Sequence, residues 1–81
     1  MKAIVNIYLK EGVLDPQGKA VKHALGSLGF KDVEDVRVGK QIVLTLKDSL
    51  SEEEAKKEVE EMCEKLLANT VIEDYDIEIV K

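Results

Sequence analysis

The chain has little of several residue types on which common functions depend. Its 81 residues include one cysteine, one histidine, one proline, two tyrosines, one phenylalanine and no tryptophan. A single cysteine excludes an internal disulfide, which fits a reducing compartment. One cysteine and one histidine also make no pattern of metal ligands. We therefore expect no metal site in this chain.

Basic residues and long apolar runs are also scarce. Lysine and arginine number 12 against 17 aspartates and glutamates, for a net charge of −5. Nucleic-acid binding depends on lysine and arginine side chains that neutralise phosphates, so we expect no nucleic-acid partner. The sequence shows neither an apolar run of about 18 residues nor a signal peptide. We expect a single cytoplasmic domain over residues 1–81 that makes no membrane contact.

The spacing of apolar residues predicts six elements. Their order is strand, helix, strand, strand, helix, strand, with Gly39-Lys40 as a tight hairpin turn between the middle strands. This order indicates the α+β class and a split-βαβ, ferredoxin-like plait (βαββαβ), an antiparallel sheet with two helices on one face. The expected ranges are 2–10, 33–38, 41–47 and about 73–80 for the strands, and 16–28 and 51–67 for the helices.

Both predicted helices carry recognisable end signals. Asp15 is a good N-cap residue before Pro16, and Gly29 suits the left-handed position after a helix. Ser51 and Glu54 form a capping box. Gly18 does not fit this scheme, because glycine in a helix costs roughly 1 kcal/mol relative to alanine. The stretch 12–18 therefore has a role besides capping. The expected buried stripe of the second helix is Ala55, Val59, Met62, Cys63, Leu66 and Leu67.

The residues with reactive side chains do not assemble into catalytic machinery. Cys63 lies in an apolar helical stripe, where a free cysteine acts as a small buried hydrophobe. Arg37 and Lys40 place two cations at the predicted hairpin, either as solubilising charges or as a grip for an anion or a partner's carboxylate. Glu73 and Asp74 are adjacent carboxylates with no second cluster to complete a site, so we assign them to a surface or interface. We expect no catalytic residue in the chain.

Four stretches together match a known family. They are residues 13–18, residues 24–25 together with 28–30, residues 36–40 and residues 63–75, and they span nearly the whole chain. With them the chain resembles the PurS-type small subunit of formylglycinamide ribonucleotide amidotransferase, also called phosphoribosylformylglycinamidine (FGAM) synthase, of de novo purine biosynthesis. Thr70 departs from the pattern, since many relatives have proline after the asparagine, and it loosens the φ restriction of that turn.

The resemblance implies a non-catalytic role in an ATP-dependent ligase that uses glutamine as its amide donor. A glutaminase subunit releases ammonia, and a large synthetase subunit binds ATP and Mg²⁺ and adds that ammonia to its substrate. The PurS-type subunit bridges the two partners and supports ammonia transfer, with no cofactor of its own. The alternative from another class is a small-molecule-sensing regulatory domain of plait fold. An acylphosphatase-type hydrolase and an RNA-recognition plait fit less well, because the chain lacks the required arginine loop and stacking aromatics.

We expect two sets of contact residues. One is the sheet face opposite the helices, which is too apolar to stay exposed as a continuous patch; we expect it to form at least a homodimer, which is most often twofold symmetric. Its candidates are Ile4, Tyr8, Val43 and Thr45. The candidates for contact with the partner subunits are Leu14, Asp15, Gln17, Arg37, Lys40, Asn69, Glu73, Asp74 and Tyr75.

Overall fold

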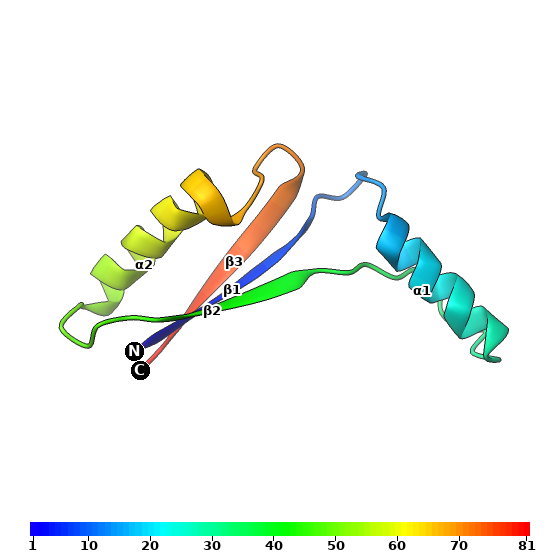
Figure 1. The fold of residues 1–81 in the computed structure, drawn as a ribbon, viewed down its shortest axis with the longest axis horizontal. Coiled ribbons are helices and arrows are strands. Elements are labelled where there is room, and N and C mark those ends of the chain that lie inside the picture. The colour runs from blue at the N-terminus through cyan, green and yellow to red at the C-terminus, as the bar shows by residue number, and fades with distance from the viewer.

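A computed structural model describes the whole chain, from Met1 to Lys81, and shows an antiparallel sheet of three strands with two helices (Figure 1). The strand order is β2-β1-β3, so the N-terminal strand lies in the centre. The α+β class is confirmed. The elements are β1 (Lys2–Leu9), α1 (Pro16–Ser27), β2 (Lys40–Thr45), α2 (Glu52–Met62), a π-helical turn η1 (Cys63–Leu67) and β3 (Glu73–Val80). None of the helices has the length and apolar character needed to cross a bilayer.

The core lies between the central strand and α2. Ala3, Val5 and Ile7 alternate along β1 with almost no exposed surface, as period two requires for a strand covered on one side. Helix α2 packs over β1 and β3 and contributes Val59, and η1 contributes Cys63; both residues are also fully buried. Only nine of the 81 residues are buried. The single chain therefore has a small core and depends on few contacts for its stability.

The predicted helix ends are confirmed. The backbone N–H of Gly18 donates to Asp15 Oδ1 at 2.9 Å, which caps α1. The capping box of α2 is complete, because Glu54 N–H donates to Ser51 Oγ at 3.1 Å and Ser51 N–H donates to Glu54 Oε1 at 3.4 Å. Gly29 has a φ of +99° just after α1, the left-handed conformation that glycine adopts without steric cost.

The predicted strand at 33–38 and the hairpin at Gly39-Lys40 are wrong. The segment is extended but pairs with no strand, and it runs directly into β2. Its backbone is held elsewhere, because the Val38 N–H donates to Asp15 Oδ2 at 2.7 Å. The segment therefore bonds to the loop before α1 and does not pair with the edge of the sheet.

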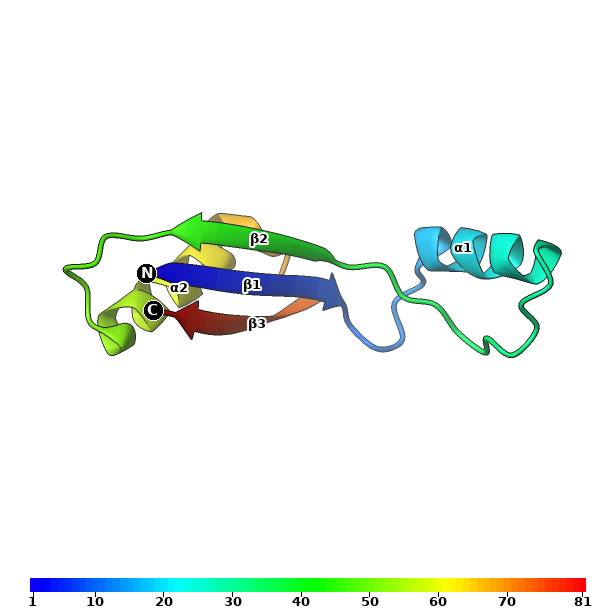
Figure 2. The ribbon, with the colours of Figure 1, turned by 90° about the horizontal axis from the view of Figure 1, so that it is seen from below.

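The prediction that both helices cover one face of the sheet is wrong for α1. Only α2 packs on the sheet, and α1 lies beyond its end, with the chain returning alongside it to β2 (Figures 1 and 2). We call residues 10–39 the arm. The molecule measures 50 × 26 × 14 Å with a radius of gyration of 16.2 Å, against roughly 12 Å for a compact chain of this length. The arm accounts for this elongation.

The buried stripe of the second helix is correct except at its end. Ala55, Val59 and Cys63 are buried, but Leu66 is 82% exposed. The cause is η1, in which the Ala68 N–H donates to the Cys63 carbonyl five residues back, at 3.0 Å. A π-helical turn holds more residues than an α-helical one, so Leu66 is rotated out of the stripe.

Candidate functional site

A hollow of about 280 Å³ opens where the arm joins the sheet, and we call it the notch. Four of its lining residues are polar and come from three parts of the chain: Asp15 and Gln17 from the start of α1, Lys40 from β2, and Glu73 from β3. The remaining lining residues are Ile7, Tyr8, Leu9, Val38 and Gly39. All four polar residues were predicted as partner contacts, so the fold brings together side chains that are far apart in the sequence.

Asp15 holds the arm to the rest of the notch. The residue is only 5% exposed, and its two carboxylate oxygens accept from different segments, Val38 N–H at 2.7 Å and Gly18 N–H at 2.9 Å. These backbone hydrogen bonds lower the pKa of Asp15 below its usual value, and the bond from Val38 has the largest effect. The nearby Arg37 charge lowers the pKa further. Asp15 is therefore ionised at neutral pH and acts as a structural clamp, because hydrogen bonds from N–H groups favour the charged carboxylate.

Gly18 is required for close packing in the same junction. A Cβ atom at this position would lie 2.0 Å from the Val36 carbonyl oxygen and 2.9 Å from its carbon. Only glycine leaves room for the backbone of the arm's returning segment at this point. The reason for a glycine in the first turn of α1 is therefore a backbone contact within the chain.

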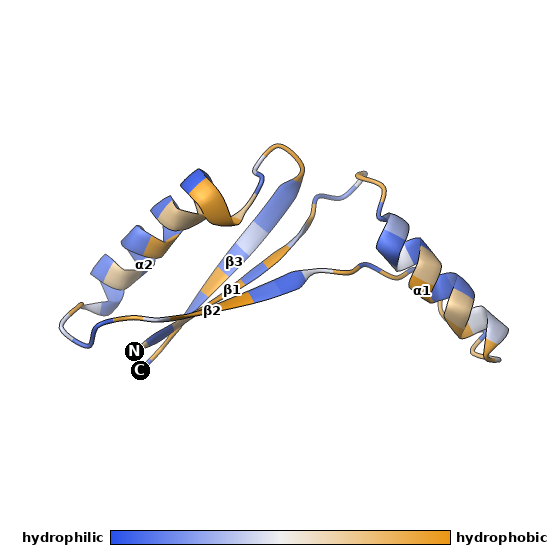
Figure 3. Ribbon diagram, viewed as in Figure 1, coloured by the Kyte–Doolittle hydropathy of each residue, from blue (hydrophilic) through white to orange (hydrophobic).

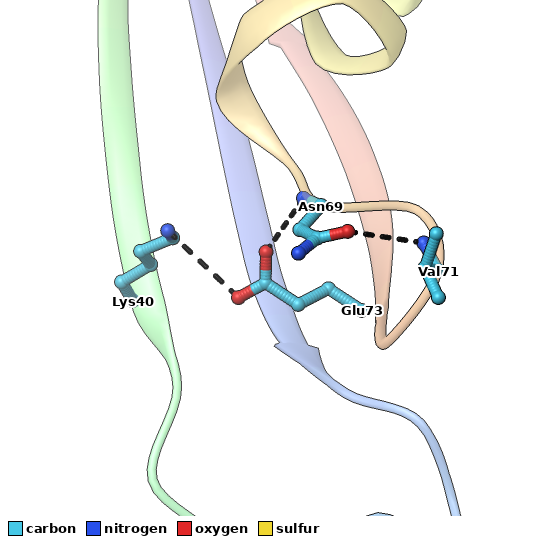
Figure 4. Close-up of polar contacts among 4 residues, drawn as sticks. All are labelled: Lys40, Asn69, Val71 and Glu73. Carbon is cyan, nitrogen blue, oxygen red and sulfur yellow. Dashed lines mark hydrogen bonds and ion pairs between the residues drawn. The ribbon is translucent and has the colours of Figure 1, made fainter.

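Glu73 ties the opposite wall of the notch together (Figure 4). Its Oε1 accepts from the Asn69 N–H at 2.7 Å, and its Oε2 lies 3.8 Å from Lys40 Nζ. Asn69 in turn accepts from the Val71 N–H through Oδ1 at 3.3 Å, which closes the turn before β3. The Glu73 side chain is 17% exposed and that of Lys40 56%. Lys40 thus presents a positioned ammonium group at the rim of the notch.

The other predicted partner contacts lie outside the notch. Leu14 is 60% exposed on the loop before α1, and Arg37 uses Nη2 to donate to the Lys10 carbonyl at 3.1 Å. Asp74 and Tyr75 are adjacent in β3 and point to opposite faces. Tyr75 is half-buried on the α2 side, where burial raises the pKa of its hydroxyl. Asp74 is exposed on the face away from α2.

The four self-association candidates share the sheet face away from α2. Ile4 lies opposite Val43 in the β1–β2 register, and Thr45 pairs with Lys2 at the end of the same ladder. Tyr8 is 43% and Val43 52% exposed. The face is therefore open and partly apolar, and its role in self-association stays a prediction.

A polar ladder that sequence reasoning missed crosses this face. Gln41 Nε2 donates to Asn6 Oδ1 at 3.0 Å, and Asn6 Nδ2 donates to Asp76 Oδ1 at 3.0 Å. The three side chains come from β2, β1 and β3 and are directly opposite one another in register. The sequence signal that could have indicated this ladder is a polar residue on the solvent-facing side of each strand. The ladder sets Tyr8 apart from the apolar pair Ile4 and Val43, so the apolar surface is divided.

The fold defines the class of small α+β proteins with an arm that extends beyond the sheet and a polar notch where the two meet. The carboxylates of the notch are engaged in holding the backbone. Cys63 is buried, and desolvation raises the pKa of its thiol, the reverse of what activates a nucleophilic cysteine. No group of three or more histidine, cysteine, aspartate or glutamate side chains is placed to hold a metal ion.

Comparisons with known proteins identify the family. The model of the family PurS, phosphoribosylformylglycinamidine (FGAM) synthase, matches residues 2–81. The PurS subunit of this synthase from Bacillus subtilis is 55% identical over 78 residues, which cover 96% of this chain and 90% of the relative. The crystal structure of PurS from Methanocaldococcus jannaschii superimposes with a TM-score of 0.89 at 50% identity, over 99% of this chain and 95% of that one. The chain belongs to the PurS family.

A further solved structure places a similar chain in an assembly. A chain in the structure of PurLQS from Thermotoga maritima has a TM-score of 0.87 and 29% identity, and the match covers 98% of this chain and 95% of that one. The extended fold described above is therefore similar to that of a chain in the PurLQS structure.

Proposed function

We propose that this chain joins the glutaminase subunit to the ATP-dependent synthetase subunit of FGAM synthase and so supports the transfer of ammonia between them. The observation that carries the proposal is the match to the PurS family along the whole chain, residues 2–81. The similarity to a chain of the T. maritima PurLQS structure supports the bridging role. In this proposal ATP and Mg²⁺ are bound by the synthetase, and this chain acts in the cytoplasm as at least a homodimer.

The notch supports the proposal because its backbone is fixed before any partner arrives. Asp15 holds the arm, and Glu73 holds the Asn69 turn and Lys40. Gln17 lies exposed at the same rim. Surfaces that are ordered in advance lose less conformational entropy on binding. Gln17 and Lys40 are therefore the residues that we assign to contact with a partner subunit, and Asp15 keeps its structural role.

The chemistry of the notch disfavours the alternative of a small-molecule sensor. Its two carboxylates, Asp15 and Glu73, already accept hydrogen bonds from backbone N–H groups of this chain and so offer few free groups to a ligand. Titration calorimetry of the isolated chain with amino acids and nucleotides tests this directly. A ligand bound at micromolar concentration without partner proteins would favour the sensor.

The decisive experiment is reconstitution of the enzyme with and without this chain. We expect glutamine-dependent FGAM formation to fall sharply when the chain is omitted, because ammonia then has no assembled route to the synthetase. Free ammonia supplied directly should restore FGAM formation by the synthetase. An unchanged glutamine-dependent rate without the chain would contradict the proposal.

A matched pair of variants tests the notch itself. Gln17→Ala combined with Lys40→Ala should weaken co-purification with the partner subunits while the thermal unfolding temperature stays within a few degrees, because both side chains are exposed. The control, Lys47→Ala, removes an exposed charge just beyond β2 and outside the notch. If the double variant and the Lys47→Ala control affect assembly equally, the notch is not part of the interface.

A further inference from the structure

The polar side of α1 carries a concentration of positive charge. A hollow of about 510 Å³ follows this side of the helix, and none of the residues that line it is apolar. We call these residues the cationic strip: Lys19, Lys22, His23, Gly26, Ser27 and Lys31. Helix α1 contains no acidic residue, and Figure 3 shows hydrophilic residues recurring along it. The strip is therefore a local positive surface in a chain whose net charge is −5.

Helical spacing places most of the strip in one row. Residues 19, 22, 23, 26 and 27 recur every three or four positions, so they share one side of α1. The row is about 12 Å long, at 1.5 Å per residue. Lys19, Lys22 and His23 are all exposed. A row of this length fits a series of side chains on another protein better than one small anion, which would reach only one or two of the lysines.

Two of the three lysines are held in place by backbone carbonyl groups. Lys22 Nζ donates to the Glu34 carbonyl at 2.7 Å, and Lys31 Nζ donates to the Gly26 carbonyl at 2.7 Å. A lysine ammonium has three N–H donors, so each group keeps two donors for another molecule. Charges that are positioned in advance lose less side-chain entropy when they bind a partner.

No carboxylate of the chain neutralises the strip. None of the three ion pairs in the structure involves one of its residues, although Asp32, Glu34 and Asp35 follow closely in the sequence. The acidic helix α2 lies at the other end of a molecule 50 Å long (Figure 1). That separation greatly exceeds the screening length of about 8 Å at physiological ionic strength. The charge of the strip is therefore available to another molecule.

A purely local role explains only part of the strip. Cations near the end of a helix stabilise it by complementing the helix dipole, which accounts for Lys31. Lys19 lies near the start of α1, where the dipole does not favour a positive charge. The stability of α1 therefore gives no reason for a lysine at position 19.

We infer that the cationic strip docks on an acidic surface of one of the partner subunits in the synthase complex. The inference rests on the proposed function and assigns a contact separate from the notch. The surface that fits presents carboxylates in a row of about 12 Å, the length of the strip. Complementary charge of this kind guides the approach and the orientation of two proteins. A chain that joins two different subunits needs such a means of telling them apart.

Charge reversal at Lys19 tests the inference. Binding of the chain is measured with the glutaminase subunit, with the synthetase subunit and with both together. Lys19→Glu should raise the dissociation constant for one partner at least about fivefold, because it replaces an attraction with a repulsion. Its circular dichroism should be unchanged, since lysine and glutamate have similar helix propensities. Lys19→Arg, which keeps the charge, should bind as the unmodified chain does.

Lys56→Glu is the matched control. Lys56 is also an exposed lysine in the early part of a helix, lies outside the strip, and gives the same change in net charge. It should leave the dissociation constants unchanged. For the partner that loses affinity with Lys19→Glu, raising NaCl from about 50 to 300 mM should weaken binding of the unmodified chain more than binding of the variant, because salt screens the attraction.

Three results would overturn the inference. The first is an equal loss of affinity in Lys19→Glu and Lys56→Glu, which would reduce the effect to net charge. The second is unchanged affinity of Lys19→Glu for both partners. The third is saturable binding of inorganic phosphate to the isolated chain below about 1 mM that Lys19→Glu abolishes, since the strip would then be a small-anion site. The bridging role is tested separately, by omitting the whole chain from the reconstituted enzyme.

Discussion

Replacing Gly18 by alanine tests whether the arm is held as the structure shows. Helix propensity alone favours the substitution by about 1 kcal/mol, because alanine is the better helix former. The packing opposes it, since the new Cβ would lie 2.0 Å from the Val36 carbonyl oxygen. The two effects have opposite signs, so the sign of the measured change decides between them.

The structure sets the size of the effect. Real Cβ atoms do not approach other atoms closer than 3.0 Å, so the Val36 carbonyl must retreat by about 1.0 Å (3.0 − 2.0). Overpacking of this kind costs about 1–3 kcal/mol. Subtracting the helix gain leaves a net destabilisation of about 1 kcal/mol.

Gly26→Ala is the matched control, because it is in the same helix and a Cβ there meets nothing within 4 Å. It should stabilise the protein by about 1 kcal/mol. The two variants should therefore differ by about 2 kcal/mol in free energy of unfolding, which is roughly 8–16 °C in Tm for a domain of this size. Urea and thermal unfolding measure both at one protein concentration. If Gly18→Ala stabilises the protein as much as Gly26→Ala does, the close contact with Val36 is refuted.

Three further predictions follow from burial and charge. Backbone hydrogen bonds hold the Asp15 pKa below its usual value of 3.8. The contribution of Asp15 to stability is therefore complete above about that pH and is lost as the pH falls through the lowered pKa. In urea unfolding between about pH 2 and 6, the free energy of unfolding of Asp15→Asn should depend less on pH than that of the unmodified protein. Val59→Ala, at a fully buried position, should cost about 2 kcal/mol, whereas Val71→Ala, at an 81% exposed one, should cost less than about 0.5 kcal/mol. The Cys63 thiol, whose pKa burial raises, should react with a thiol reagent only after unfolding, and rapid labelling of the folded protein would contradict its buried position.

Elements defined by neighbouring residues could be predicted well. The Asp15 and Ser51 caps and the alternation in β1 and β3 depend on residues within a few positions of one another, and each is observed where expected. The predicted strand at 33–38 failed for a different reason. Its valines satisfy strand periodicity, but the N–H of Val38 is taken by a carboxylate 23 residues earlier, and no local pattern reveals such a partner.

The candidate site likewise has features that the sequence predicts and features that only the fold creates. Its residue types were visible in the sequence, since Asp15, Gln17, Lys40 and Glu73 were all selected as contact residues. Their roles were not visible. Asp15 is a buried clamp and Lys40 an exposed partner of Glu73, a difference created by which side chains the fold places around them. Asp74 lies outside the notch because the strand period of two sends it to the face opposite Glu73, and Tyr75 lies outside it because it packs against the core on the α2 side.

The sequence by itself determined the α+β class, the helix ends, the central strand and the family, because these depend on local periodicity, capping chemistry and short stretches of residues. Tertiary structure alone decided that α1 stands off the sheet and that Gly18 is needed for a backbone contact. Those features depend on hydrogen bonds and contacts between residues far apart in the chain. The backbone N–H of Val38 can bond either to the edge of the sheet or to Asp15. In this chain it donates to the carboxylate of Asp15, and the arm extends away from the core.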